Sequence, residues 1–101
     1  MNGRALVEIP VSWVLDDAPY FLFTGQRAMQ PPGPVLQGWL TEFEGITAMG
    51  GVTNFTFHPQ IIGRPSRFAC LRELIEHARH TPKLWLARLE QIAAHTRAEL
   101  A

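Results

Sequence analysis

The sequence predicts an α/β fold in which short strands alternate with helices. Two apolar runs that are rich in β-branched and aromatic residues, 5–13 and 52–57, have the composition of strands. Apolar residues recur at helical spacing in three other stretches, at 35–46, 66–80 and 89–100. Because strands and helices alternate along the chain, right-handed crossovers are expected to place the strands parallel.

The first predicted strand is Ala5 to Trp13, ALVEIPVSW. Apolar residues occupy both of its faces, as in a strand covered on both sides, although Pro10 predicts a bulge or a place at the sheet margin. The connection that follows, Val14 to Pro34, is roughly 20 residues long, which is unusual in a compact domain and typical of a functional segment. It contains the acidic pair Asp16-Asp17.

Three helices are predicted between and after the strands. The first ends at Gly50-Gly51, the second is capped by Ser66 and runs to His80, and the third spans 89–100. The residues expected to face inward are Val35, Leu36, Trp39, Leu40, Phe43 and Ile46 on the first, Phe68, Leu71, Leu74, Ile75 and Ala78 on the second, and Leu89, Ile92 and Ala93 on the third.

The second predicted strand, Val52 to Phe57, must end at His58. Pro59 lacks a backbone donor and disfavours helical geometry in the residue before it. Lys83 to Leu86 is a third, short candidate strand. Three strands with three helices cover a parallel sheet poorly and leave both of its edges open. The chain is therefore expected to self-associate or, as the favoured alternative, to be the C-terminal part of a larger α/β domain.

Length and composition indicate one small globular domain. The chain has 101 residues, of which 47% are hydrophobic, and its nine basic residues balance nine acidic ones. This balance argues against a nucleic-acid partner or an anionic membrane surface. The single cysteine, Cys70, allows no disulfide within the chain and is expected to be a small buried side chain. No apolar run approaches the roughly 18 residues of a membrane span, so a soluble, cytoplasmic chain is expected.

His58 is the first candidate functional residue. In α/β proteins, chemistry usually takes place at the C-terminal ends of parallel strands, and His58 lies at such an end. The loop that follows supplies Arg64 and Arg67, which suits a general acid or an anion-stabilising site. The alternative is a histidine that caps the strand and bonds to nearby backbone.

The pair Asp16-Asp17 is the second candidate. Paired carboxylates can bind a metal, orient a histidine, or separate into an acid and a base. Aspartates also start turns by bonding to their own backbone, which the following Ala18-Pro19 favours. If the first two strands are parallel, Asp16 and His58 emerge at the same edge of the sheet.

Further polar and aromatic residues have several possible roles. Arg64 is expected to pin its loop to the aspartate pair by a salt bridge, with carboxylate or phosphate binding as the alternative. Trp13 precedes the connection and could contact a ligand, although a core position is the more common role of tryptophan. His77 and His80 have a spacing that is compatible with metal binding, but no third ligand lies nearby in the sequence, and no metal site is expected there.

Three segments, LVEIPVSWVLDDAPYF, FTFHPQIIGRPSR and WLARLEQIAAH, occur in an order that resembles the C-terminal portion of polysaccharide deacetylases. The nearest branch includes allantoinase-like and peptidoglycan deacetylase-like members. The resemblance implies a distorted (β/α) barrel, of which residues 1–101 would form the C-terminal β-α-β-α-β-α part. It also implies hydrolysis of a non-peptide carbon–nitrogen amide bond, typically in an N-acetylated sugar, and many members use a divalent metal.

By this resemblance, His58 matches the histidine of the last active-site motif and would protonate the leaving amine or stabilise the tetrahedral intermediate. Asp16, Asp17 and Arg64 match recurrent positions near the active site. The family's N-terminal aspartate pair, His-x-x-x-His metal motif and Arg-x-Pro-Tyr segment have no counterpart here. The chain is therefore expected to be inactive alone, with the base and any metal supplied by a missing N-terminal part.

Two alternatives remain open. The first is a non-catalytic small α/β module that forms a homo-oligomer or binds a partner. The second, and the least favoured, is a freestanding metallohydrolase that uses Asp16, Asp17 and His58.

Overall fold

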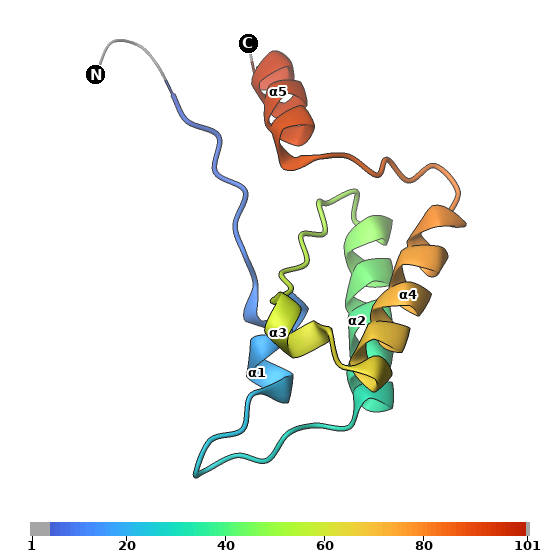
Figure 1. The fold of residues 1–101 in the computed structure, drawn as a ribbon. Helices are drawn as coiled ribbons and strands as arrows, with labels where there is room; N and C mark the ends of the chain where they lie inside the picture. The colour runs from blue at the N-terminus through green and yellow to red at the C-terminus, as the bar shows by residue number, and fades with distance from the viewer. Residues whose placement is uncertain (1–4, 101) are drawn as a thin grey trace.

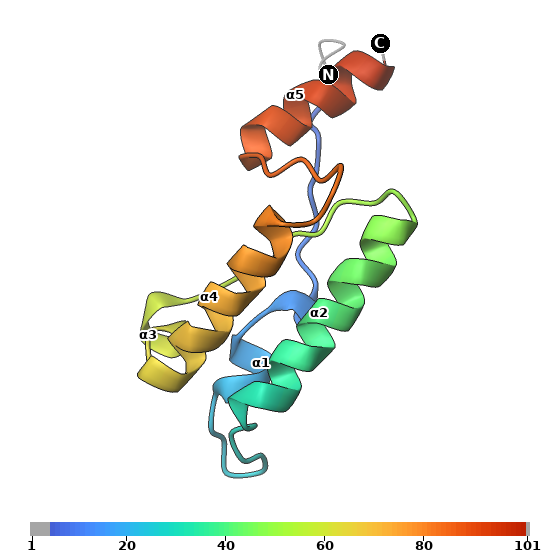
Figure 2. The same cartoon turned by 90° about the vertical axis from the view of Figure 1, so that its right-hand side faces the viewer.

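The computed structural model describes residues 5–100, in which all the regular secondary structure is helical (Figure 1). The elements are the 3₁₀ helix η1 (Trp13–Leu15) and the α-helices α1 (Ala18–Phe21), α2 (Pro32–Ala48), α3 (Pro59–Ile62), α4 (Pro65–Arg79) and α5 (Leu89–Leu100). The two long helices α2 and α4 lie side by side, and the short helices α1 and α3 lie next to them (Figures 1 and 2). Helix α5 stands apart from the other helices (Figure 1).

Helices α2 and α4 begin and end for local reasons. Each has a proline in its first turn, where the missing N–H has no intrahelical partner to lose. Helix α2 is followed by Gly50 with a φ of +74°, a left-handed conformation that favours glycine after a helix. The predicted capping role of Ser66 is wrong: Arg64 is the N-cap residue of α4, and Ser66 lies inside its first turn.

Trp39 on α2 is the centre of the core. Its indole is fully buried and packs edge-to-face against the rings of Tyr20, Phe21, Phe55 and Phe57, with centroid distances of 5.5–6.1 Å. These contacts join α2 to α1 and to the extended segment 52–57 that leads to His58. The inward stripe predicted for α2 is confirmed, because Val35, Leu36, Trp39 and Phe43 are buried and Leu40 and Ile46 are half-buried.

The other two predicted helical stripes are covered only in part. On α4, Cys70 and Leu74 are buried as expected, whereas Phe68 and Ile75 remain about half exposed. Helix α5 contains no buried residue. The apolar stripes of α4 and α5 are thus wider than the rest of the described chain can cover.

The three predicted strands do not form within residues 5–100. One isolated parallel bridge, between Asp16 and Thr56, joins the end of the first apolar segment to the second. Its backbone bonds run from Thr56 N–H to Leu15 O (2.8 Å) and from Asp17 N–H to Thr56 O (3.1 Å). The predicted parallel direction is therefore seen at one bridge, but the β-α-β-α-β-α order is not confirmed. A strand depends on hydrogen bonds from neighbouring strands, which sequence composition alone does not supply.

The long connection 14–34 is more ordered than predicted. It contains α1 and the end of η1, and a bond from Gln30 N–H to Tyr20 O (2.8 Å) ties it back to α1. Among the described residues, no helix is both long and apolar enough to cross a membrane.

Candidate active site

The site is built on a contact between Asp17 and His58, which are 41 positions apart in the chain. Asp17 is fully buried, and both of its carboxylate oxygens are bound to the same residue. Oδ2 accepts the backbone N–H of His58 at 2.8 Å, and Oδ1 lies 2.6 Å from Nδ1 of the imidazole. An ionised carboxylate can only accept hydrogen bonds, so Nδ1 carries a proton and donates a hydrogen bond to Asp17. Nε2 is the ring nitrogen that remains for a ligand.

The chain holds His58 by its backbone as well as by its ring. Its N–H binds Asp17, and its carbonyl accepts the N–H groups of Ile61 (2.8 Å) and Ile62 (2.9 Å) at the start of α3. Pro59 follows directly and opens this short helix. His58 is the N-cap residue of α3 and does not cap a strand, and its ring is oriented by a buried carboxylate rather than by backbone.

The turn after His58 is tight at Gly63. A Cβ atom at this position would lie far inside van der Waals contact with the carbonyl oxygen of Pro59. The Gly63 N–H donates to that same oxygen at 3.0 Å and closes the α3 turn. Only glycine allows so close a backbone approach, so Gly63 fixes the path from α3 into α4.

The two aspartates have different roles. Asp16 Oδ1 accepts the N–H of Ala18 at 2.9 Å, which is the local turn bond expected of an aspartate at this position. The same oxygen lies 3.8 Å from His58 Nδ1. Asp17 makes no such turn with its side chain and points at the histidine instead. The sequence offered turn formation and histidine orientation as alternatives for the pair. In the structure, Asp16 forms the turn and Asp17 orients the histidine.

The electrostatics of the site favour a protonated histidine. The hydrogen bond to Asp17 raises the pKa of the His58 imidazole above its ordinary value of 6.5. Partial desolvation opposes this shift, while the negative charges of Asp17 and Asp16 add to it. The net effect is an imidazolium that persists to higher pH than in an isolated histidine, on a side chain that is 39% exposed.

Arg67, and not Arg64, holds the loop around His58. Its Nη1 donates to the carbonyl of Ile61 on α3 (3.0 Å), its guanidinium lies 4.8 Å from the ring centroid of Phe21, and its Nη2 contacts Met29 Sδ at 3.1 Å. No ion pair between Arg64 and either aspartate is found in residues 5–100, so the predicted salt bridge is wrong. Both arginines lie in the same motif, and the sequence contains no signal that tells which one turns back onto α3.

Replacing Arg67 with alanine is expected to lower the free energy of unfolding by about 1–2 kcal/mol, since it removes a hydrogen bond and a cation–π contact. Urea unfolding followed by far-UV circular dichroism measures this change. Arg64→Ala is the matched control, because that side chain is exposed, and its effect should stay within about 0.5 kcal/mol. Equal losses in the two variants would contradict the assignment of the pinning role to Arg67.

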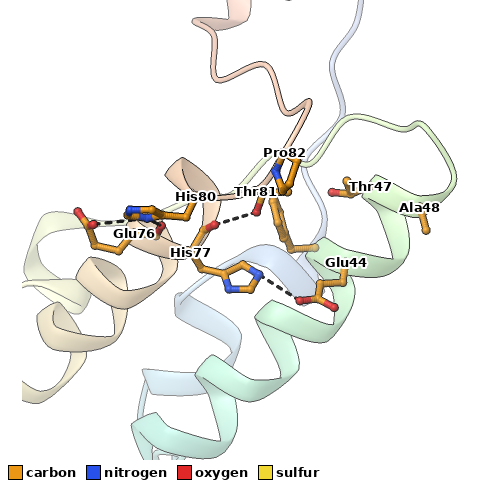
Figure 3. A pocket seen from close by; sticks show the side chains of 9 residues that line it. Glu44, Thr47, Ala48, Glu76, His77, His80, Thr81 and Pro82 are labelled. Carbon is orange, nitrogen blue, oxygen red and sulfur yellow. Dashed lines mark hydrogen bonds and ion pairs between the residues drawn. The ribbon is translucent and has the colours of Figure 1, made fainter.

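Trp13 and the histidines of α4 lie outside this cluster. Trp13 is 80% exposed in η1, so it is not part of the core. His77 Nε2 contacts Glu44 Oε1 on α2 at 3.1 Å, whereas His80 Nδ1 bonds to the carbonyl of Glu76 on its own helix at 2.7 Å (Figure 3). The two imidazoles point in different directions, beside a cavity between the ends of α2 and α4 (Figure 3).

Asp16, Asp17 and His58 could each offer one ligand atom to a metal, with these atoms within 4.8 Å of one another. Their present bonds fit a metal poorly. Asp17 Oδ1 and His58 Nδ1 are 2.6 Å apart and share a proton, whereas two ligands of one metal, each at about 2.0–2.2 Å, lie further from one another. Asp16 Oδ1 is already bound to the backbone of Ala18. The cluster has the geometry of a hydrogen-bonded acid–base pair.

Comparisons with known proteins match this chain to longer ones. No protein-family model matches the sequence. A peptidoglycan deacetylase from Helicobacter pylori (strain ATCC 700392 / 26695) is 30% identical over 88 residues, which are 80% of this chain and 30% of that protein. The crystal structure of a putative polysaccharide deacetylase from Mycobacterium smegmatis aligns with a TM-score of 0.85 and 36% identity, over 90% of this chain and 33% of that one. The chain belongs to the polysaccharide deacetylase family.

The chain spans about a third of the length of each of these polysaccharide deacetylase relatives. The family predicted from the LVEIPVSWVLDDAPYF and FTFHPQIIGRPSR segments is confirmed, and so is the fold at the level of the family. Asp16 and His58, which the sequence placed at one edge, are brought together in the structure, with Asp17 beside them. Arg67 holds the loop after His58 by its bond to Ile61, a role that the sequence analysis assigned to Arg64.

Proposed function

We propose that this chain is the C-terminal part, over residues 1–101, of a single polysaccharide deacetylase-like domain that hydrolyses a non-peptide carbon–nitrogen amide bond. The proposed substrate is the N-acetyl group of a carbohydrate. The observation that carries the proposal is the buried Asp17 bound to Nδ1 of the partly exposed His58. This pairing leaves Nε2 as a proton donor with a fixed orientation.

The chemistry follows from the protonation state of His58. When water attacks the amide carbonyl, the tetrahedral intermediate breaks down only if the nitrogen leaves as a neutral amine. The imidazolium donates its Nε2 proton to that nitrogen, the electron pair of the broken carbon–nitrogen bond stays on nitrogen, and the imidazole becomes neutral. Nδ1 keeps its proton throughout and donates a hydrogen bond to Asp17, whose negative charge stabilises the imidazolium and raises the pKa of His58.

The remaining groups of the proposed reaction lie elsewhere in the domain. The base that activates water comes from the missing N-terminal part, and so does any divalent metal that polarises the carbonyl. Within this chain, Asp16 supports the turn that carries Asp17, and Arg64 and Trp13 are exposed at positions where they could contact a sugar.

A chimera tests this function. In it, this chain replaces the matching 88-residue segment of the Helicobacter pylori peptidoglycan deacetylase. We expect acetate release from an N-acetylated amino-sugar oligomer by the chimera, and none by the chain alone. The control is the same host protein with the segment deleted. A folded chimera without activity would favour the alternative of a non-catalytic module, and activity of the chain alone would contradict the dependence on a missing part.

A further inference from the structure

Asp17 and His58 occupy the same position in two short helices. Each is the N-cap residue of a single helical turn, Asp17 of α1 and His58 of α3. The carbonyl of Asp17 accepts the N–H of Phe21 at 3.1 Å. The carbonyl of His58 accepts the N–H of Ile61 at 2.8 Å. The backbone orientation of each residue of the pair is therefore tied to the turn that follows it.

These two turns do not fix their relative position by themselves. A single helical turn is unstable in water, because its nucleation fixes several dihedral angles for one hydrogen bond. The parallel bridge between Asp16 and Thr56 fixes the backbone before each turn. In residues 5–100, however, no backbone hydrogen bond joins α1 to α3. The position of one turn against the other therefore depends on side chains.

Arg67, in the first turn of α4, contacts both short helices. Its Nη1 donates at 3.0 Å to the carbonyl of Ile61, near the end of α3, where the last carbonyls of a helix have no intrahelical partner. Its guanidinium lies 4.8 Å from the ring centroid of Phe21, the buried last residue of α1. The contact of Nη2 with Met29 Sδ, at 3.1 Å, fixes the guanidinium further. One side chain thus joins the ends of the two turns.

The charge of Arg67 does not account for the state of the histidine. The charged groups that face the imidazole of His58 are Asp17 and Asp16, and both raise its pKa. Among the described residues, Arg67 is not one of the groups that shift this pKa. A cation close to the ring would lower the pKa, because it disfavours the imidazolium. An effect of Arg67 on His58 must therefore pass through the geometry of the two turns.

We propose that Arg67 is a positioning residue of the Asp17–His58 pair. By joining the end of α1 to the end of α3, it holds the buried carboxylate and the imidazole at hydrogen-bonding distance. Its importance for amide hydrolysis rests on the proposed function, whereas its effect on the geometry of the pair does not. A residue that held only the loop would contribute to stability and leave the pair unchanged.

The test follows the imidazole of His58 by NMR in the 101-residue chain that carries Arg67→Met. Methionine keeps a long apolar side chain over the ring of Phe21 but cannot donate a hydrogen bond to Ile61. We expect the pKa of His58 to fall toward its ordinary value of 6.5, and the low-field signal of its hydrogen-bonded Nδ1–H to be lost. Loss of the Arg67 charge alone would shift this pKa in the opposite direction.

Two further variants complete the comparison. Arg67→Lys keeps a positive charge and a donor but lacks the planar guanidinium, so it should restore part of the pKa shift and of the Nδ1–H signal. Arg72→Ala is the matched control, because it removes another arginine of α4, whose guanidinium lies 5.6 Å from the ring centroid of Phe68. It should leave both NMR readouts unchanged. If Arg67→Met does not fold, a pKa of His58 in Arg67→Lys equal to that of the wild type overturns the proposal, and a lower one supports it.

The same substitution in the Helicobacter pylori chimera separates this inference from the proposed function. Arg67→Met should lower kcat for acetate release by about 10- to 100-fold and leave KM within about twofold, because a misplaced donor affects the transition state more than substrate binding. A folded Arg67→Met chain with an unchanged His58 pKa and Nδ1–H signal would overturn the positioning role. The expected NMR changes with an unchanged kcat would support that role and contradict the proposed function of His58 as the acid.

Discussion

His58→Ala is expected to lower kcat/KM for acetate release by the Helicobacter pylori chimera by about 100- to 10,000-fold, the range typical of removing a general acid. The substitution removes the imidazole that the Asp17 carboxylate orients as a proton donor. Without it, the leaving amine must take its proton from water. The measurement is steady-state acetate release at neutral pH, with circular dichroism to show that the variant chimera is folded.

His80→Ala is the matched control for this experiment. His80 is exposed at the C-cap of α4, and among the described residues its Nδ1 bonds to the carbonyl of Glu76 in that helix. Its removal should leave kcat/KM within about twofold, since it is far from the transition-state charge. If the His58→Ala chimera keeps nearly full activity, His58 is a structural cap of α3 and has no catalytic role.

Trp39→Ala is expected to have the largest effect on stability, with a loss of about 3–5 kcal/mol in the free energy of unfolding. That is a large fraction of the roughly 5–15 kcal/mol that holds a typical domain folded. The indole is fully buried and contacts four aromatic rings, so its loss leaves a cavity between α1, α2 and segment 52–57. Urea unfolding of the chain, followed by far-UV circular dichroism, gives the difference.

Two further variants sharpen this prediction. Trp39→Phe should cost less than Trp39→Ala, because it keeps an aromatic ring and removes Nε1, a buried donor that has no partner among the described residues. Trp85→Ala, at a side chain more than half exposed, is the control and should cost well under half as much. Similar losses for Trp39→Ala and Trp85→Ala would contradict the position of Trp39 at the centre of the core.

Local sequence signals predicted the helices well. Prolines, glycines and apolar spacing placed α2, α4 and α5 within a few residues, and the stripe around Trp39 was identified in full. These signals suffice because a helix makes its hydrogen bonds within itself. The strands failed for the opposite reason: the hydrogen bonds of residues 5–13, 52–57 and 83–86 depend on neighbouring segments, and the described chain supplies one bridge.

The site was predicted by topology more than by motif. The expected parallel direction of the first two extended segments brought Asp16 and His58 to one edge, and the structure shows them together. Which aspartate contacts the histidine depends on which way each side chain points from the turn, and the sequence did not settle this. The same holds for Arg67, whose reach back to Ile61 depends on how α3 and α4 cross.

The pH dependence of kcat/KM in the Helicobacter pylori chimera tests the central claim most directly. If protonated His58 is the acid, activity is present at pH values below its folded-state pKa and falls as the pH rises through that value, which lies above 6.5. Asp17→Asn removes the main cause of the raised pKa, so this alkaline limb should move to lower pH. An alkaline limb at the same pH in the wild-type and Asp17→Asn chimeras would contradict the role of the Asp17–His58 pair.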